Sequence, residues 1–242
     1  MPLINRREML GQSFTSGALA FSMPGEPSPR KRKVIVTGGH PGDPECGCGG
    51  TIARYSDLGY DIVLIYLNDG VPIGKPRDGV RVAEAKKACE ILKARPVFAG
   101  QVDGEAVVDR AHYEAFHAIL EAEKPDAVFT HWPIDNHADH RAISMLVYDA
   151  WVWMKRGFAL YYHEVSNGED TVHFAPTHYV DITAAAERKR RGCYAHASQS
   201  PDKFYALQEQ VTRLRGIEGG FRQAEGFTRH VQSPDFTLPL AF

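Results

Sequence analysis

The stretch Lys33–Gly50 reads KVIVTGGHPGDPECGCGG and joins a β-branched run to a polar cluster. The run KVIVT predicts a buried strand, because β-branched residues favour strands and the glycines after it interrupt them. The cluster carries His40 and Asp43 on a loop that two prolines stiffen. Because α/β folds bind ligands beyond the carboxyl ends of their strands, we expect a functional site here.

A second polar cluster, HWPIDNHADH at residues 131–140, follows another hydrophobic run at residues 127–130. It supplies the side chains of Asp135, His137, Asp139 and His140. If both runs are parallel strands, the two clusters lie at the same edge of one sheet. Clustered histidine and aspartate side chains are typical of a catalytic zinc site, which has three protein ligands and one position open for water.

The rest of the chain alternates hydrophobic runs with amphipathic stretches. The expected strands are residues 33–37, 61–67, 96–99, 127–130, 159–165 and an edge strand at 179–182. The expected helices are residues 49–58, 80–93, 110–123, 138–154, 183–196 and 201–214. This alternation predicts an α/β fold, a Rossmann-like three-layer sandwich with a mostly parallel sheet. The Gly-rich remainder from residue 216 is expected to be irregular.

Charge and cysteine content exclude several classes of protein. The 242 residues include 28 Lys and Arg against 30 Asp and Glu, and the formal net charge of -2 argues against nucleic acid as a partner. No apolar run reaches the ~18 residues that a membrane span needs. The four cysteines are too few and too unevenly spaced for a disulfide framework. Cys46 and Cys48 lack the second cysteine pair that a thiolate metal site would need.

The first residues differ in composition from the remainder. Arg6 and Arg7 precede a weakly apolar stretch, and Ala18–Ala20 offers a small-x-small cleavage site. This pattern resembles a twin-arginine export signal, and a leader with a chance arginine pair is the alternative. We expect residues 1–32 to be signal and linker and residues 33–242 to form the folded domain. The protein is then exported to the periplasm or medium, or is cytoplasmic if the leader is no signal.

Four motifs, in order along the chain, resemble those of the PIG-L/LmbE-like zinc-dependent deacetylases. GHPGDPE at 39–45, followed by GCGGT at 47–51, resembles the opening A-H-P-D-D-x-E and G-C-G-G of that family. RVAEA at 81–85 resembles the R-x-x-E-A helix of the family. DNHADHR at 135–141 resembles the second histidine motif of the family. HASQ at 196–199 resembles its H-x-S-Q. The resemblance spans residues 33 to 199 and is specific for the family but not for a substrate.

The resemblance implies a hydrolase that removes an N-acetyl group from an amino sugar or a related small glycoconjugate. It implies that His40, Asp43 and His140 hold one Zn²⁺ per chain, although other divalent metals could occupy the same donor set. His137 would stabilise the tetrahedral intermediate or protonate the leaving amine. Asp139 would orient a histidine ligand.

Three further residues complete the predicted site. His196 would approach from the C-terminal segment and help hold the oxyanion or the substrate. Arg81 would contact the substrate or pair with a nearby acid, and both remain open. Asp69 stands on the loop 68–79, which is expected to shape substrate specificity.

Gly42 departs from the family pattern, because the usual motif carries there the aspartate that serves as general base. General base catalysis typically contributes ~10²–10⁴-fold to a rate. The candidates to replace that aspartate are Asp135, Glu45, Asp69 and a neutral His137. Because of this departure, two functions remain as alternatives to an active N-deacetylase. One is a weakened or inactive family member that binds sugar or metal, and the other is an ester deacylase.

Overall fold

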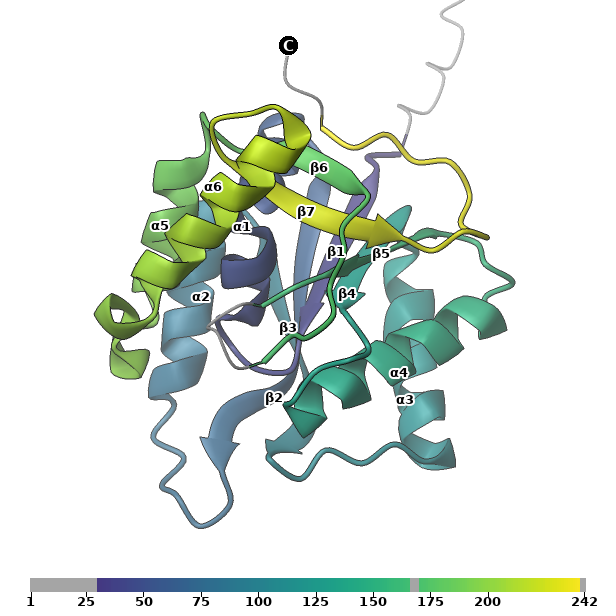
Figure 1. Cartoon of the computed structure of the whole chain (residues 1–242). Helices are drawn as coiled ribbons and strands as arrows, with labels where there is room; N and C mark the ends of the chain where they lie inside the picture. Colours follow the sequence, from purple (N-terminus) through teal and green to yellow (C-terminus); the bar gives the residue numbers. More distant parts are fainter. Residues whose placement is uncertain (1–29, 166–169, 240–242) are drawn as a thin grey trace, which may run out of the picture. The chain divides into compact units, whose positions relative to one another are not determined.

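Strand β1 (Lys33–Gly38) lies inside a seven-stranded sheet of order β3-β2-β1-β4-β5-β7-β6 (Figure 1). The computed structural model describes residues 30–165 and 170–239. The strands that pair in parallel are β1, β2 (Asp61–Pro72), β3 (Arg95–Asp103), β4 (Ala127–His131) and β5 (Ala159–His163). The sheet is therefore mostly parallel, as the alternation of strands and helices predicted.

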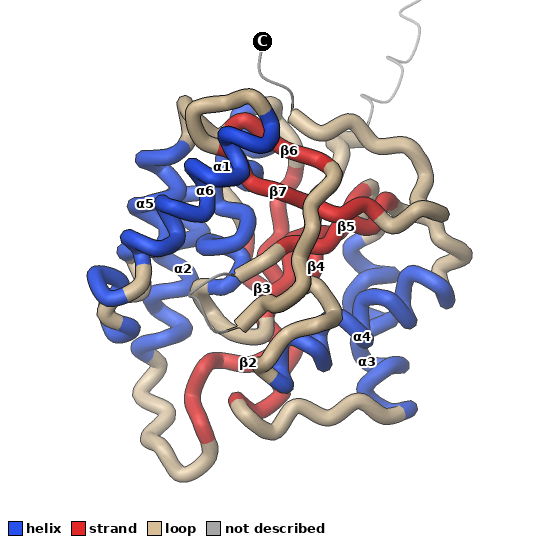
Figure 2. Tube along the Cα trace, viewed as in Figure 1, coloured by secondary structure: helices blue, strands red, loops and turns tan. Residues whose placement is uncertain are grey.

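Helices cover both faces of the sheet (Figure 2). On one face lie α1 (Asp43–Asp57), α2 (Val80–Leu92), α5 (Ala186–Tyr194) and α6 (Tyr205–Gly219), and on the other α3 (Arg110–Glu123) and α4 (Ala138–Trp153). Two short 3₁₀ turns, Ala197–Gln199 and Pro201–Lys203, connect α5 to α6. The arrangement is the expected three-layer sandwich.

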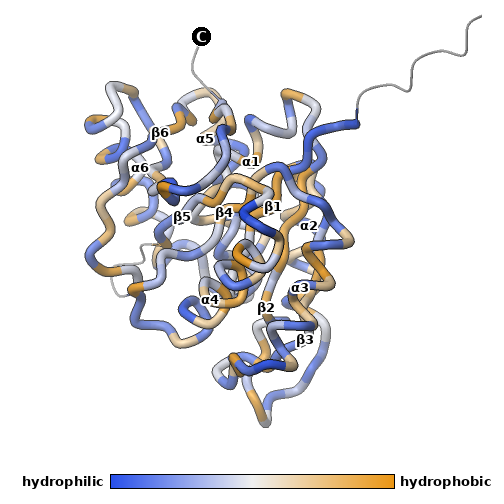
Figure 3. The backbone as a smooth tube through the Cα atoms, turned by 90° about the vertical axis from the view of Figure 1, so that its right-hand side faces the viewer, coloured by the Kyte–Doolittle hydropathy of each residue, from blue (hydrophilic) through white to orange (hydrophobic). Residues whose placement is uncertain are grey.

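Alternating side chains of β1 enter two separate hydrophobic cores. Val34 and Val36 pack with the α1 and α2 side, and Ile35 packs with the α3 and α4 side. Figure 3 shows hydrophobic residues gathered along the central strands. Because both faces of β1 are buried, its sequence is a continuous apolar run, which made it the clearest strand to predict.

The sheet ends in two antiparallel strands, β6 (His178–Asp181) and β7 (Ala224–Arg229), and β7 also pairs antiparallel with β5. The expectation of an irregular segment after residue 216 was wrong here. The strand reads AEGFTR and has no continuous apolar run, so its sequence carries little strand signal. Pairing with β5 and β6 supplies the backbone hydrogen bonds that form it.

Helix α1 begins at Asp43, six residues before the expected start. Gly42 is the N-cap, Pro44 stands in the first turn, and the Glu45 carboxylate accepts a hydrogen bond from the Gly42 N–H at 3.2 Å. This cap forms part of the polar cluster itself, so Asp43 belongs to the first turn of a helix. Strand β2 likewise extends to Pro72, into the segment expected to be loop.

The described residues from Lys31 onward form one compact unit. The predicted signal with its cleavage site falls in residues 1–29, outside the described residues. None of the helices in the described part of the chain is long and apolar enough to cross a membrane.

A buried ion pair joins β7 to the helical layer. Glu225 Oε1 lies 2.6 Å from Lys189 Nζ of α5, and both side chains are almost completely buried. The same carboxylate accepts hydrogen bonds from the backbone N–H groups of Gly50 and Thr51 in α1, at 2.9 and 2.8 Å. Three elements that lie far apart in the sequence are held together at this one carboxylate.

Replacing Glu225 with Gln should lower the free energy of unfolding by about 3–5 kcal/mol, because the Lys189 ammonium is then buried without its counter-charge. Urea denaturation followed by circular dichroism measures this change. The matched control is Glu209→Gln, which breaks an exposed pair with Arg213 at 3.1 Å and should cost less than ~1 kcal/mol. Equal small losses in the two variants would contradict the structural role of Glu225.

Candidate metal centre

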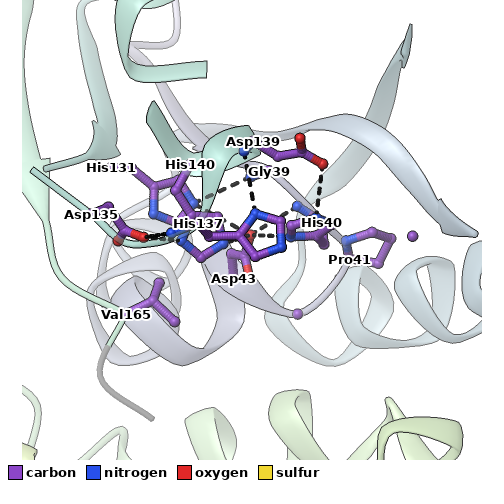
Figure 4. Close-up of polar contacts among 12 residues, drawn as sticks. Gly39, His40, Pro41, Asp43, His131, Asp135, His137, Asp139, His140 and Val165 are labelled. Atoms are coloured by element: carbon purple, nitrogen blue, oxygen red, sulfur yellow. Dashed lines mark hydrogen bonds and ion pairs between the residues drawn. The ribbon is translucent and has the colours of Figure 1, made fainter. Parts of the chain in front are cut away.

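The two polar clusters meet at the carboxyl ends of β1 and β4. These strands are adjacent and parallel, so the loop after β1 and the loop after β4 leave the sheet at the same edge. His40 lies on the first loop, Asp43 opens α1, and His140 lies in the first turn of α4 (Figure 4). The two motifs therefore form one site, although their contacting residues His40 and Asp139 are 99 positions apart in the sequence.

Asp43 is the centre of the donor set. Its Oδ2 lies 3.3 Å from His40 Nδ1 and 3.2 Å from His140 Nε2. Ligand atoms bonded to one tetrahedral ion at 2.0–2.1 Å lie about 3.3 Å apart, so each of these two separations matches that between two ligands of one Zn²⁺-sized ion. His131 Nε2 lies at 3.3 Å from the same oxygen, although this histidine was not among the predicted ligands.

The second ring nitrogen of each predicted histidine ligand faces a carboxylate. His40 Nε2 lies 3.1 Å from Asp139 Oδ2 and 3.1 Å from Asp103 Oδ1. His140 Nδ1 lies 3.1 Å from Asp135 Oδ1. Carboxylates in this position fix the ring orientation and increase the basicity of a metal-bound histidine. The residues present thus fit a metal ion both in their donor atoms and in the groups behind the donors.

The structure places Asp135 and Asp139 behind the donors, where each accepts further hydrogen bonds. Asp135 accepts the His137 N–H at 2.8 Å through Oδ1 and the Thr171 hydroxyl at 2.9 Å through Oδ2. Asp139 Oδ2 accepts hydrogen bonds from Asn68 Nδ2 and from the Gly104 N–H, both at 2.9 Å. This geometry suits Asp135 to orienting His140 and leaves it poorly placed to accept a proton from the cavity.

Charge in the cluster follows from burial and from these close pairs. Burial disfavours an ionised Asp43, but the neighbouring imidazoles of His140, His131 and His40 hold the pKa of this carboxyl well below its usual range. Burial likewise disfavours a charged His140, yet the Asp43 and Asp135 carboxylates raise its pKa to about 9. Burial and the nearby His140 lower the pKa of His131 to about 3, so His131 is neutral.

His137 is the N-cap of α4 and lies between the two predicted histidine ligands. Its ring centroid is 4.5 Å from that of His40 and 4.8 Å from that of His140. Burial and these two imidazoles lower its pKa, so the ring is neutral at pH 7. His137 Nδ1 accepts the Asp139 N–H at 3.2 Å, and we assign the ring proton to Nε2 for that reason. His137 thus offers one N–H donor on the side away from α4.

His196 enters the site from the segment that follows α5. Its Nε2 lies 3.1 Å from Glu45 Oε1, which also accepts the Tyr66 hydroxyl at 2.7 Å. Glu45 is fully buried and its other oxygen caps α1 at Gly42. The structure therefore uses Glu45 as an anchor for the first loop and for His196.

Gly42 adopts a backbone conformation that L residues rarely take, with φ of 114°. A Cβ at this residue would lie 3.8 Å from His196 Cδ2, which is ordinary contact. The space beside Gly42 would therefore accept a side chain, but the backbone favours glycine.

A cavity of about 360 Å³ opens next to the donor set. Arg81 lines it and donates hydrogen bonds to the backbone oxygens of Pro41 at 2.8 Å and Gly70 at 3.2 Å. Arg81 thus holds the first loop while its side chain faces the cavity. Asp69 is outside the lining of this cavity and pairs with the exposed Arg77.

Sequence reasoning missed two carboxylates that line the cavity, Asp103 and Asp170. Asp103 is the last residue of β3, and the rule that sites form at strand ends would have found it had this strand not been expected to end at residue 99. Asp170 lies near the site because its backbone oxygen accepts the Asn136 N–H at 2.9 Å. No local pattern marks that contact.

The fold and site define a class of protein, an α/β chain whose clustered His and Asp side chains at the strand ends fit one divalent metal ion. The sequence model of the family PIG-L: GlcNAc-PI de-N-acetylase matches residues 35–151. A diacetylchitobiose deacetylase of Thermococcus kodakarensis is 29% identical over an alignment of 225 positions, which covers 83% of this chain and 84% of that protein.

Solved structures share the fold. The conserved protein TT1542 of Thermus thermophilus has a TM-score of 0.74 at 26% identity, covering 86% of this chain and 98% of that one. The N,N'-diacetylchitobiose deacetylase of Pyrococcus horikoshii has a TM-score of 0.71 at 23% identity, covering 82% and 84%. The chain is thus similar in sequence and fold to the PIG-L/LmbE-like deacetylases, the family that its four motifs resemble.

Replacing Asp135 with Asn should weaken Zn²⁺ binding about 10–100-fold, because the His140 ring loses the carboxylate that orients it and raises its basicity. Competition against a chromophoric chelator measures the affinity. The matched control is Asp69→Asn, which removes a carboxylate outside the cavity and should leave the affinity unchanged. If Asp135→Asn binds Zn²⁺ as tightly as the control, Asp135 does not orient a ligand.

Proposed function

We propose that this chain is a metal-dependent hydrolase that removes an N-acetyl group from an amino sugar or a related small glycoconjugate. The observation that carries the proposal is the Asp43 donor set with His40 and His140, placed beside a cavity of small-sugar size. The match of this chain to a deacetylase family model and its similarity to a diacetylchitobiose deacetylase support an acetylated amino sugar as the substrate class.

His40, Asp43 and His140 would hold the metal, and zinc suits this set of two imidazoles and one carboxylate. When bound, such an ion acidifies water and polarises the carbonyl oxygen of an amide. The protein's own contribution is to hold the two imidazoles in register, which Asp135, Asp139 and Asp103 do from behind.

His137 supplies a hydrogen-bond donor for the reacting carbonyl. During attack by water, negative charge develops on the carbonyl oxygen, and a fixed N–H donor stabilises that charge. His137 is neutral and carries its proton on Nε2, so it donates without first losing or gaining charge. Its attachment at the N-cap of α4 holds the ring in place beside the donor set.

We propose that Asp170 accepts the proton that leaves the attacking water, since residue 42 has no side chain. Asp103 and Asp170 both line the cavity. The Asp103 carboxylate already pairs with His40, whereas no described residue donates a hydrogen bond to the Asp170 carboxylate. Burial raises the pKa of Asp170 above its usual range, and the Asp135 and Asp43 carboxylates add to this rise, although the nearby His140 opposes it. A carboxylate of raised pKa that faces a site is suited to general base catalysis.

Purified protein loaded with Zn²⁺ should release acetate from N,N'-diacetylchitobiose or N-acetylglucosamine, and a chelator should abolish the release. Gly42→Ala and Gly42→Asp should both lower this activity, because both place an L residue at a φ of 114°. The alanine variant is the matched control, since it carries the same backbone strain without a carboxylate. We expect the two variants to agree within a few-fold.

Other outcomes would favour the alternative functions. A wild-type protein that is inert until Gly42→Asp restores a rate would mark a sugar- or metal-binding protein that has lost its base. Release of acetate from O-acetyl sugars but from no N-acetyl sugar would mark an ester deacylase.

Asp170→Asn should lower kcat about 10²–10³-fold with little change in KM, because it removes the proton acceptor and keeps the shape of the side chain. In the wild type, activity should fall as the pH drops through the pKa of Asp170, since only the carboxylate accepts a proton. Formate should partly rescue an Asp170→Gly variant by supplying a carboxylate in the same space. A normal kcat in Asp170→Asn would contradict the assignment.

We further propose that the protein is exported, on the basis of the Arg6-Arg7 pair and the small-residue site that follows it. Cell fractionation would locate the protein.

A further inference from the structure

Two cysteines lie side by side in the wall of the cavity. The Sγ atoms of Cys46 and Cys193 are 3.4 Å apart, although 147 residues separate them in the sequence. Their exposed fractions are 7% and 0%, and both residues line the cavity. The other two cysteines, Cys48 and Cys89, are buried in the larger hydrophobic core on the same side of the sheet.

The contact follows from a close approach of α1 and α5. A Cβ at Gly49 would lie 2.9 Å from Lys189 Cγ, so only a glycine lets the two helices come this near. Cys46 precedes Gly49 by three residues and Cys193 follows Lys189 by four, which is about one helical turn in each case. The Lys189 ion pair with Glu225 holds α5 against this same side of the molecule. The two thiols are thus preformed neighbours in the folded chain.

We propose that Cys46 and Cys193 form a site of covalent modification, an intramolecular disulfide that joins α1 to α5. A disulfide has an S–S length of about 2.05 Å, so the two sulfurs need to approach by little more than 1 Å. In the reaction two S–H bonds break and one S–S bond forms. Two electrons and two protons pass to an oxidant, which is an azo compound or a disulfide-bearing oxidant.

The surroundings determine how readily the bond forms. The hydrogen bond with Cys193 and burial raise the pKa of the Cys46 thiol, while the nearby Lys189 ammonium opposes this rise. The thiolate is the reactive form, so the pair stays reduced unless an oxidant is present for long enough. An exported protein meets such oxidants, and a pair that is already in contact can be oxidised without unfolding.

The bond would stand directly beside residues of the site. Cys46 follows Glu45, and Cys193 precedes His196 by three residues. Because Glu45 and His196 are hydrogen-bonded to one another, a bond between the cysteines would fix the same two segments a second time. The inference goes beyond the proposed function, since the bond forms whether or not the chain hydrolyses an amide.

The test uses the full chain, fully reduced and then treated with diamide, an azo oxidant that takes up the two electrons and two protons. The protein is then unfolded and alkylated with iodoacetamide, and its intact mass is measured. We expect two of the four cysteines to be protected, and peptide mapping to join the peptide of Cys46 to that of Cys193. Dithiothreitol should restore alkylation of all four. The oxidised protein should unfold roughly 10 °C higher, because the bond closes a very long loop.

Two variants separate this pair from the other thiols. Cys89→Ala should keep both the cross-link and the rise in unfolding temperature, whereas Cys193→Ala should lose both. The mass measurement on the wild type needs no variant, so it decides the question even if Cys193→Ala folds poorly. Alkylation of all four cysteines after diamide, or a cross-link through Cys48 or Cys89, would overturn the proposal.

Discussion

One carboxylate oxygen, Oδ2 of Asp43, lies within 3.3 Å of three imidazoles and holds the two polar motifs together. Its negative charge is stabilised by these rings and by the N-terminus of α1, where backbone N–H groups favour an anion. Gly42 adopts an unusual φ of 114° where the chain turns from the loop directly into the helix. The loop after β1, α1 and the first turn of α4 are all arranged around this oxygen.

The donors and the carboxylates behind them form a balanced set of charges. Close carboxylates raise the pKa values of His40 and His140, so without a metal ion these rings carry the positive charge of the site. A divalent ion would replace those protons, since only deprotonated imidazoles bind a metal. His131 and His137 stay neutral because burial and nearby rings lower their pKa values. This difference in pKa separates His40 and His140, which are suited to holding charge, from the neutral histidines, which are suited to donating a hydrogen bond.

The C-terminal third of the chain completes the site from the side opposite to α4. Strand β7 holds α5 through Glu225 and Lys189, and α5 in turn delivers His196 to Glu45 and Cys193 to Cys46. The first motif therefore depends on residues about 150 positions later for its anchoring. This explains why the H-x-S-Q segment, which carries no predicted ligand, accompanies the two ligand motifs in one chain.

The sequence by itself determined the parallel α/β sheet and the two strands that carry the site, because buried parallel strands are continuous apolar runs and sites form where such strands end. Its resemblance to the family motifs predicted His40, Asp43 and His140 as the donor set. Only the tertiary structure decided that β7 is a strand, that Asp103 and Asp170 line the cavity, that Asp69 does not, and that Cys46 meets Cys193. Each of these depends on a contact between segments far apart in the chain. Such contacts are specified by packing and hydrogen bonding between whole elements, which leave no periodic pattern in the local sequence.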